Sequence, residues 1–363
     1  PASVTKLFTT STALLADGPD ATLTTELRID GTIDDGTLDG DLIVRGAGDP
    51  SFSTTAIATL AAAAKRAGIT KITGSLRADL GTWTSQQGTD LTGGRYNGEI
   101  GGRLGALVVA RGFASASVTD PARQVLVRLR DALKAGGLRG TVDLAASTPS
   151  SDATTVIAAV KSPTIARLIA ATNQPSDNFY AEELLRGLGA RHGTAGTTAQ
   201  GLAVEREQLG ALGVRASLVD GSGLSRGNRV APTTIVRLLD QMAAHTTGAQ
   251  LRASLPLAGA TGTLAGRMRG TAADGRCRAK TGTLSNVSAL AGWCTTLGGR
   301  TVTFAILMNK VSVPAARVRQ NAIAAAIAGW SDKPSAASAT PSPTPTPTTS
   351  GAASGGATAG AVQ

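Results

Sequence analysis

The sequence predicts an α+β protein in which helices pack on a sheet, and two observations lead to this fold class. First, 42% of the 363 residues are hydrophobic but only 3% are aromatic, so the cores must be built from Val, Leu, Ile and Ala. Such aliphatic cores suit helices that cover a sheet. Second, helical patterns dominate residues 159–244, whereas three strand-like runs gather between residues 277 and 308. The length suffices for two domains, or for one large domain with an insertion.

The first part of the chain alternates between helix and strand. Val4–Ala16 is an apolar run suited to a buried helix, and Asp17-Gly18-Pro19 ends it. Residues 23–53 have a strand-like pattern, with turn signals at Asp30-Gly31 and Asp34-Asp35-Gly36. The elements expected next are a helix at 55–68, a strand at 69–80, a short strand at 104–109 and a helix at 121–136.

The second part is mainly helical until its last strands. A helix is expected over residues 156–173, with Pro163 near its start or at a break. The other elements expected are helices at 178–189, 201–212 and 235–244, strands at 277–280, 288–295 and 301–308, and a helix at 314–328. From residue 331 the composition collapses into Ser, Ala, Thr, Pro and Gly, which predicts a disordered tail over 331–363.

Charge and composition exclude several functions. The net charge of +10 is carried mostly by scattered arginines, with no basic cluster interleaved with aromatic residues, so no nucleic-acid partner is expected. No apolar run reaches the ~18–20 residues of a membrane span, and no signal peptide is visible in the chain. No His/Cys cluster has metal-ligand spacing and no glycine loop suits a phosphate, so we expect no metal and no cofactor.

The chain has two cysteines, Cys277 and Cys294. If the runs that contain them form an antiparallel hairpin with its turn near residues 284–287, the two cysteines could lie opposite one another. A disulfide there would indicate an oxidising compartment, and two buried free thiols are the alternative.

Three short motifs carry the chemistry. Ser3-Val4-Thr5-Lys6 at a helix start places a serine nucleophile and a lysine base three residues apart on one face. Ser176-Asp177-Asn178 offers a second hydroxyl that could relay a proton and an amide that could hold a substrate carbonyl and the Lys6 head group.

The third motif, Lys280-Thr281-Gly282, follows Cys277 on an expected strand. Its lysine and threonine can bind a substrate carboxylate, and its glycine lets a ligand approach the backbone. The backbone N–H groups of Thr283 and Ser3 could form an oxyanion hole. Each motif is weak by itself, but the three occur together in a meaningful order.

These residues resemble the penicillin-recognising serine enzymes. More closely, they resemble the D-alanyl-D-alanine carboxypeptidase/endopeptidase family of the penicillin-binding protein 4 type, peptidase family S13. The resemblance covers residues 1–330 and includes blocks at 1–10, 46–50, 176–182, 220–229, 261–264 and 279–292. The block that begins at Asp220 is interpreted as a structural turn near the site.

The resemblance implies a β-lactamase/transpeptidase-like catalytic domain, with an antiparallel sheet flanked by helices, built from residues 1–22 and 159–330. An accessory α/β domain would be inserted at residues 23–158. The family's catalytic domain normally begins with a helix and strands before the nucleophile block, so the N-terminal part of the fold is expected to be truncated here.

The resemblance also implies roles for the motif residues. Ser3 would be the acylated nucleophile, Lys6 its base and Ser176 the proton relay. The substrate would be held by Asn178, Lys280, Thr281, Gly282 and Thr283. The expected partners are peptidoglycan stem peptides and β-lactam antibiotics, and the expected location is extracytoplasmic, either secreted or associated with the cell wall.

Other functions remain open at the level of sequence. A serine β-lactamase shares the three motifs, although its usual Glu-x-x-Leu-Asn loop is not found between the second and third of them. A non-catalytic penicillin-binding or wall-associated module on the same fold is a further alternative. The sequence does not separate carboxypeptidase from endopeptidase activity, because both use the same serine.

Overall fold

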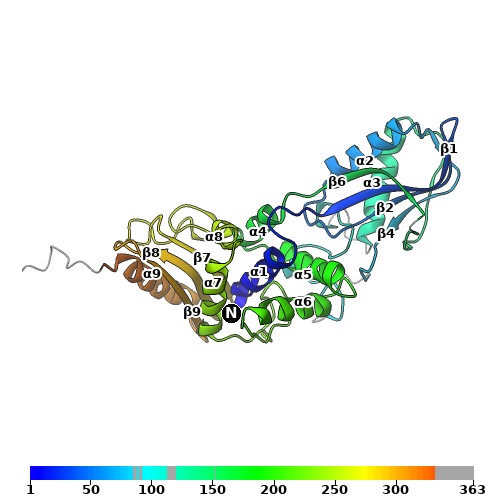
Figure 1. The fold of residues 1–363 in the computed structure, drawn as a ribbon. Coiled ribbons are helices and arrows are strands. Elements are labelled where there is room, and N and C mark those ends of the chain that lie inside the picture. The colour runs from blue at the N-terminus through cyan, green and yellow to red at the C-terminus, as the bar shows by residue number, and fades with distance from the viewer. Residues whose placement is uncertain (85–87, 90–91, 113–119, 152, 332–363) are drawn as a thin grey trace, which may run out of the picture.

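The computed structural model describes residues 1–84, 88–89, 92–112, 120–151 and 153–331, so the expected tail lies, apart from Ser331, outside the described residues. The molecule is elongated (Figure 1), with a helix-covered sheet at one end and a larger helical part with a second sheet at the other. Within these ranges, no helix has both the length and the apolar character needed to cross a membrane.

The bounds of the elements are as follows. The α-helices are α1 (Lys6–Ala16), α2 (Thr54–Arg66), α3 (Pro121–Ala135), α4 (Ile165–Asn173), α5 (Asn178–His192), α6 (Thr198–Ala211), α7 (Pro232–Ala244), α8 (Gly248–Ser254) and α9 (Val313–Gly329). Short 3₁₀ helices are η1 (Ala2–Thr5), η3 (Gly98–Ile100), η4 (Ala110–Gly112) and η5 (Gly262–Leu264). The strands are β1 (Thr24–Asp34), β2 (Thr37–Arg45), β3 (Lys71–Ile72), β4 (Ser75–Asp79), β5 (Asp143–Leu144), β6 (Thr155–Lys161), β7 (Cys277–Leu284), β8 (Val287–Thr295) and β9 (Thr301–Asn309).

Helix α1 lies at the centre of the larger part. Its residues from Lys6 to Leu14 are all buried, and it packs against α4, α5, α6 and α8. A helix surrounded in this way must satisfy its polar side chains internally. Thr10 and Thr12 do so by donating to the carbonyls one turn earlier, those of Lys6 and Phe8. The central position of α1 fixes the residues at its N-terminus.

The β7–β9 sheet is an antiparallel meander with β8 in the middle. Strand β8 is buried on both faces, and its side chains alternate between two cores. Ala289 and Trp293 join the core around α1 and α7, whereas Leu290 and Cys294 join a core that includes Ala324 of α9. Helices therefore cover both faces of this sheet.

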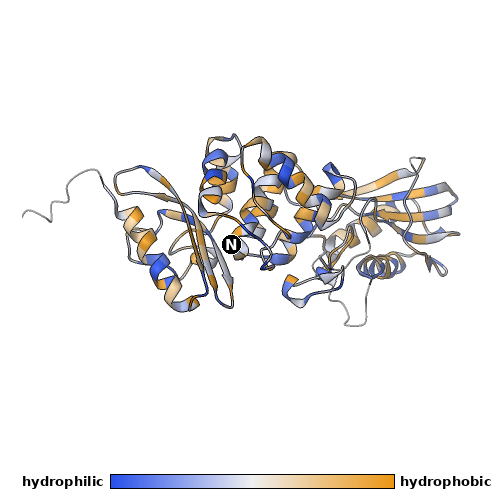
Figure 2. Cartoon of the chain, turned by 90° about the horizontal axis from the view of Figure 1, so that it is seen from below, coloured by the Kyte–Doolittle hydropathy of each residue, from blue (hydrophilic) through white to orange (hydrophobic). Residues whose placement is uncertain are grey.

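The β1–β6 sheet is mixed, with the order β5-β4-β2-β1-β6 and β3 beside β2. Its own core is formed with α2 and α3, from residues such as Leu42, Leu60 and Leu129. In Figure 2 the strands of this sheet, at the right of the view, carry hydrophobic residues interspersed with hydrophilic ones. A small fourth core, made of Ile100, Leu104, Val108 and Phe179, joins the segment between β4 and α3 to α5.

The turn expected at Asp30-Gly31 is wrong, because β1 continues through these residues to Asp34. Gly31 pairs with Gly40 of β2, and both glycines have φ near 140°. A Cβ atom on either glycine would collide with the opposite strand. The glycines therefore permit a close approach of two strands, and the chain turns instead at Asp35-Gly36, as the second signal predicts.

Two other expected elements differ in the structure. Residues 155–161 form β6 rather than the first half of a helix, because Val156, Ile157 and Val160 belong to a strand that pairs with β1. The boundary expected between residues 158 and 159 therefore falls inside β6. The strand expected at 104–109 does not form, because its backbone bonds elsewhere: the Gly105 N–H donates to Glu183, and the Ala106 carbonyl accepts from Gly48.

Candidate active site

The start of α1 brings Ser3 and Lys6 together. Ser3 lies in η1, Lys6 is the first residue of α1, and the Lys6 Nζ atom donates to Ser3 Oγ over 3.0 Å. A 3₁₀ turn aligns residues three apart, so the tight turn suits this pair. Because helix N-termini favour negative charge, the position also favours an anion forming on Ser3.

Two glycines enclose the backbone of the nucleophile segment. A Cβ atom at Gly282 of β7 would lie 2.5 Å from the Pro1 carbonyl oxygen and 3.1 Å from the Ser3 nitrogen. A Cβ atom at Gly223 would meet the Ala2 carbonyl, and Gly223 has a φ of +84°. Ala2 itself has a φ of +50°. Left-handed backbone at a residue with a side chain persists only where its surroundings fix it. These neighbours therefore hold Ser3 in one position.

Lys6 is fully buried and has three acceptors around its ammonium group. Besides Ser3, Nζ donates to Asn178 Oδ1 and to the Ser222 carbonyl, both at 2.6 Å. Burial lowers the pKa of Lys6 to about 8, although the nearby carboxylates Glu182 and Asp220 oppose this shift. The lysine can therefore lose its proton near neutral pH.

The turn after Asp220 supplies the Ser222 carbonyl. Asp220 accepts from the N–H groups of Gly223 and Ser225, at 2.8 and 2.7 Å. Glu182 Oε1 accepts from the Ser222 N–H at 2.8 Å, and burial raises the pKa of Glu182 to about 7. The block interpreted from sequence as a structural turn therefore also provides a partner for Lys6. No side-chain pattern could have indicated this, because the group is a backbone carbonyl.

The second and third motifs meet on the other side of the nucleophile. The Lys280 Nζ atom donates to Ser176 Oγ over 2.7 Å and to the Thr281 carbonyl over 2.9 Å. Burial, and then the charge of Lys6, lower the pKa of Lys280 well below its usual value. Thr281 Oγ1 donates to Thr263 Oγ1 over 2.8 Å. The site therefore contains two buried lysines, each bonded to a serine hydroxyl.

The structure brings most of the candidate residues together. Lys6 links Ser3 to Asn178, and Lys280 links Ser176 to the segment at Thr281. Thr283 lies farther along β7, where its hydroxyl accepts from Arg317 of α9 at 3.2 Å.

The amino-acid sequence matches the family described as D-Ala-D-Ala carboxypeptidase 3 (S13) over residues 1–92 and 99–332. The chain belongs to this family. The predicted family is therefore confirmed, and with it the enzyme class, since this is a family of serine carboxypeptidases.

Two relatives illustrate the relationship of this S13 protein. A D-alanyl-D-alanine carboxypeptidase of Actinomadura sp. (strain R39) is 39% identical over 225 residues, which are 59% of this chain and 42% of the relative. Carboxypeptidase DacB of Mycolicibacterium smegmatis is 32% identical over 355 residues, which are 90% of this chain and 75% of the relative. The chain thus spans less than half of the first relative and three quarters of the second.

A solved structure shows the same fold. The crystal structure of penicillin binding protein 4 (dacB) from Haemophilus influenzae has a TM-score of 0.76 and 24% sequence identity, and the match covers 86% of this chain and 85% of that one. The α+β fold class predicted from the sequence is therefore confirmed.

The two cysteines of the S13 protein lie beside the third motif. Cys277 of β7 pairs in register with Cys294 of β8, and a disulfide joins them. Leu284 and Val287 are the last pair of the same ladder, so the hairpin turns where the sequence indicated. The bridge ties the two strands together at the end of the ladder farthest from this turn.

Proposed function

We propose that this S13 protein is a serine-type D-Ala-D-Ala carboxypeptidase/endopeptidase that acts on peptidoglycan stem peptides through an acyl-enzyme on Ser3. The observation that carries the proposal is the buried Lys6, whose Nζ lies 3.0 Å from Ser3 Oγ and whose pKa is lowered to about 8. About one Lys6 side chain in ten would then be neutral at pH 7, enough to act as a base.

In the acylation step, neutral Lys6 takes the proton of Ser3 Oγ while this oxygen attacks the carbonyl carbon of the D-Ala-D-Ala bond. The backbone N–H groups of Ser3 and Thr283 would stabilise the oxyanion. The C–N bond then breaks, and the proton that Lys6 took from Ser3 passes through Ser176 to the amine of the departing D-Ala. An ester on Ser3 and a free D-Ala result.

In the second step, water adds to the ester carbonyl and the bond to Ser3 Oγ breaks. The products are a shortened stem peptide with a new carboxylate and the regenerated Ser3 hydroxyl. A β-lactam would acylate Ser3 in the same way, but its amine stays attached to the acyl group after ring opening. The ester would therefore break down slowly, which makes β-lactams covalent inhibitors.

The substrate would lie between the motifs. Asn178 would hold a peptide carbonyl, while Lys280 and Thr281 would bind the terminal carboxylate. Gly282 would contribute indirectly, because its missing side chain leaves room for the Pro1–Ser3 backbone that presents Ser3 to the substrate. The bonds that link Lys280 to Ser176 and Thr281 to Thr263 support this assignment, because they orient the groups needed.

The same reasoning favours an extracytoplasmic location, either secreted or associated with the cell wall. Peptidoglycan lies outside the cytoplasm, and the bridge between Cys277 and Cys294 supports an oxidising compartment. We further propose no nucleic-acid partner, since the positive charge is scattered rather than gathered.

Labelled penicillin tests the proposal. Wild-type protein is expected to become covalently labelled and Ser3→Ala is not, whereas labelling of both or of neither would contradict the proposal. Digestion of purified peptidoglycan fragments, followed by mass spectrometry, is expected to yield D-Ala or cleaved cross-links. Rapid turnover of nitrocefin would instead indicate a β-lactamase.

A further inference from the structure

The segment from Asn97 to Gly112, here called the covering loop, lies against the start of α5. The Glu99 carbonyl accepts from Asn178 Nδ2 at 2.9 Å, so the loop holds the amide whose other end, Oδ1, accepts from Lys6. Ile100, Leu104 and Val108 of the loop pack on Phe179. The second motif is therefore in direct contact with a segment far from it in sequence.

Arg111 makes the strongest polar contact between the covering loop and the second motif. Its guanidinium forms a bidentate ion pair with Asp177, in which Nη1 donates to Oδ1 at 3.2 Å and Nη2 donates to Oδ2. The same group lies 5.1 Å from the centre of the Phe179 ring and 5.7 Å from that of Tyr180. A bidentate pair of parallel hydrogen bonds fixes the orientation of the Asp177 carboxylate, which a neutral or monodentate donor would not do.

Asp177 lies between Ser176 and Asn178, so its position fixes both of these neighbours. Its Oδ1 atom accepts from the Tyr180 N–H at 3.0 Å and so caps α5, while its own N–H donates to the Thr172 carbonyl at the end of α4. Ser176, immediately before it, has a φ of +64°. A serine in this left-handed conformation needs support from its neighbours.

The arginine side of the contact is also on unusual backbone. Ala110 and Arg111 have φ values of +48° and +56°. The Arg111 carbonyl accepts from the Arg103 N–H at 3.0 Å, and the Gly112 N–H donates to the Val109 carbonyl at 2.8 Å. Two consecutive left-handed residues that are not glycine are energetically unfavourable. The loop therefore needs its contacts with neighbouring segments to keep this conformation.

We propose that Arg111 is a positioning residue for acylation: through Asp177 it holds Ser176 and Asn178 where Lys280 and Lys6 can use them. The inference rests on the proposed function, because it concerns the geometry of the same site. It assigns the covering loop a part in the reaction, although Arg111 itself touches neither Ser3 nor Lys6.

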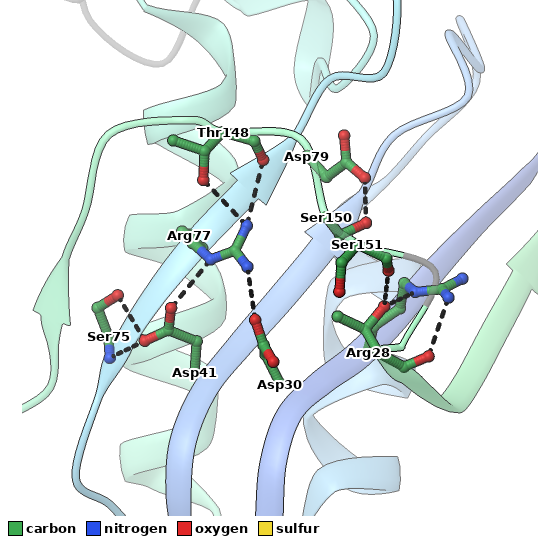
Figure 3. Close-up of polar contacts among 10 residues, drawn as sticks. Arg28, Asp30, Asp41, Ser75, Arg77, Asp79, Thr148, Ser150 and Ser151 are labelled. Carbon is green, nitrogen blue, oxygen red and sulfur yellow. Dashed lines mark hydrogen bonds and ion pairs between the residues drawn. The ribbon is translucent and has the colours of Figure 1, made fainter.

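A second arginine provides a matched control. Arg77 of β4 is more deeply buried than Arg111 and bonds two carboxylates, with Nε 3.0 Å from Asp41 and Nη2 3.3 Å from Asp30 (Figure 3). It also donates to Thr148. Since this network lies on the β1–β6 sheet, its loss should lower stability without moving the second motif.

The experiment compares Arg111→Met, Arg111→Lys and Arg77→Met with wild type. The rate of acylation by labelled penicillin is measured per folded molecule, and hydrogen exchange is followed by mass spectrometry. Arg111→Met is expected to acylate about 10- to 100-fold more slowly, the scale of a displacement of about 1 Å at a reacting group. Arg111→Lys, which keeps the charge, should recover part of the rate.

Exchange distinguishes this proposal from the proposed function. In Arg111→Met, amides of residues 174–182 should exchange faster, while those of β1 and β2 remain as in wild type. This readout needs no activity, so it decides the role of Arg111 even if wild type is not labelled. A wild-type acylation rate in Arg111→Met, an equal fall in Arg77→Met, or unchanged exchange over 174–182 would each overturn the proposal.

Discussion

At the scale of single residues, the protonation of Lys6 controls the proposed reaction. Burial lowers its pKa to about 8, and only the neutral amine can take the Ser3 proton. The rate of acylation should therefore rise with pH between about 6 and 9, with its midpoint near 8, and level off above. Stopped-flow labelling with penicillin between pH 5.5 and 9.5 measures the profile. A rate that falls over this range would mean that Lys6 acts in its charged form.

A second residue-scale prediction concerns Gly282. A methyl group there would lie 2.5 Å from the Pro1 carbonyl oxygen, so the segment that carries Ser3 must shift in Gly282→Ala. Acylation should slow by about 100-fold, with a stability loss of only about 1–3 kcal/mol. Gly210→Ala on α6 is the control, because its methyl group has free space. An equal acylation rate in both variants would show that the close packing at Gly282 is dispensable.

Some residues of the candidate site could be predicted from the sequence and others could not. The side chains of Ser3, Lys6, Ser176 and Lys280 were found because their types and spacing are characteristic. The Ser222 carbonyl and the Glu99 carbonyl were not, since every residue has a backbone carbonyl and only the fold selects one. Arg111 was missed for a different reason: it lies 66 residues from its partner Asp177 and in no motif.

At the scale of elements, local patterns predicted α1, α3 and the β7–β8 hairpin well. Each has a clear local signal in the sequence. Pro121 marks the start of α3, and the positions of the two cysteines fit the register of the β7–β8 hairpin. The strand β6 was mistaken for helix because its apolar run is short, and periodicity alone does not separate a buried strand from a helix. Its pairing with β1, more than 120 residues earlier, decides the outcome.

The contact between α1 and α6 gives an element-scale prediction. Glu205 of α6 is buried, its Oε2 accepts from Thr9 Oγ1 at 3.3 Å, and burial raises its pKa to about 8. An acid whose pKa is raised by folding binds its proton more tightly in the native state. Its contribution to stability is complete below about pH 4.5 and is lost as the pH rises through about 8.

Glu205→Gln keeps the shape of the side chain and removes this titration. Between pH 5 and pH 9 the variant should lose less unfolding free energy than wild type, by more than about 1 kcal/mol. Urea unfolding at the two pH values measures the difference. Glu182 and Glu183 remain in both proteins and shift in the same direction, so some pH dependence persists. Parallel curves for wild type and variant would show that Glu205 does not titrate in this range.

At the scale of the whole molecule, the separate cores suggest two units. We propose that the β1–β6 sheet with α2 and α3 is an inserted unit, ending after β6, and that residues on either side of it form the catalytic unit. The cores around Leu129 and Leu239 share no residue, and the small core at Phe179 joins the two parts. The sequence alone could place this insertion only by resemblance, because no linker-like composition separates the units.

This arrangement predicts that the two units lose structure separately. Leu129→Ala on α3 and Leu239→Ala on α7 each remove a fully buried side chain, at a cost of about 2–5 kcal/mol. Hydrogen exchange should accelerate in the β1–β6 sheet for the first variant and in α1 and the β7–β9 sheet for the second. If either variant accelerated exchange equally throughout the described residues, the protein would unfold as one cooperative unit. Separate responses would instead mean that the two units unfold independently and that the covering loop is the contact between them. Exchange over residues 174–182 should then increase in Leu239→Ala, because α5 belongs to the catalytic unit, and should stay as in wild type in Leu129→Ala, as it should in Arg77→Met.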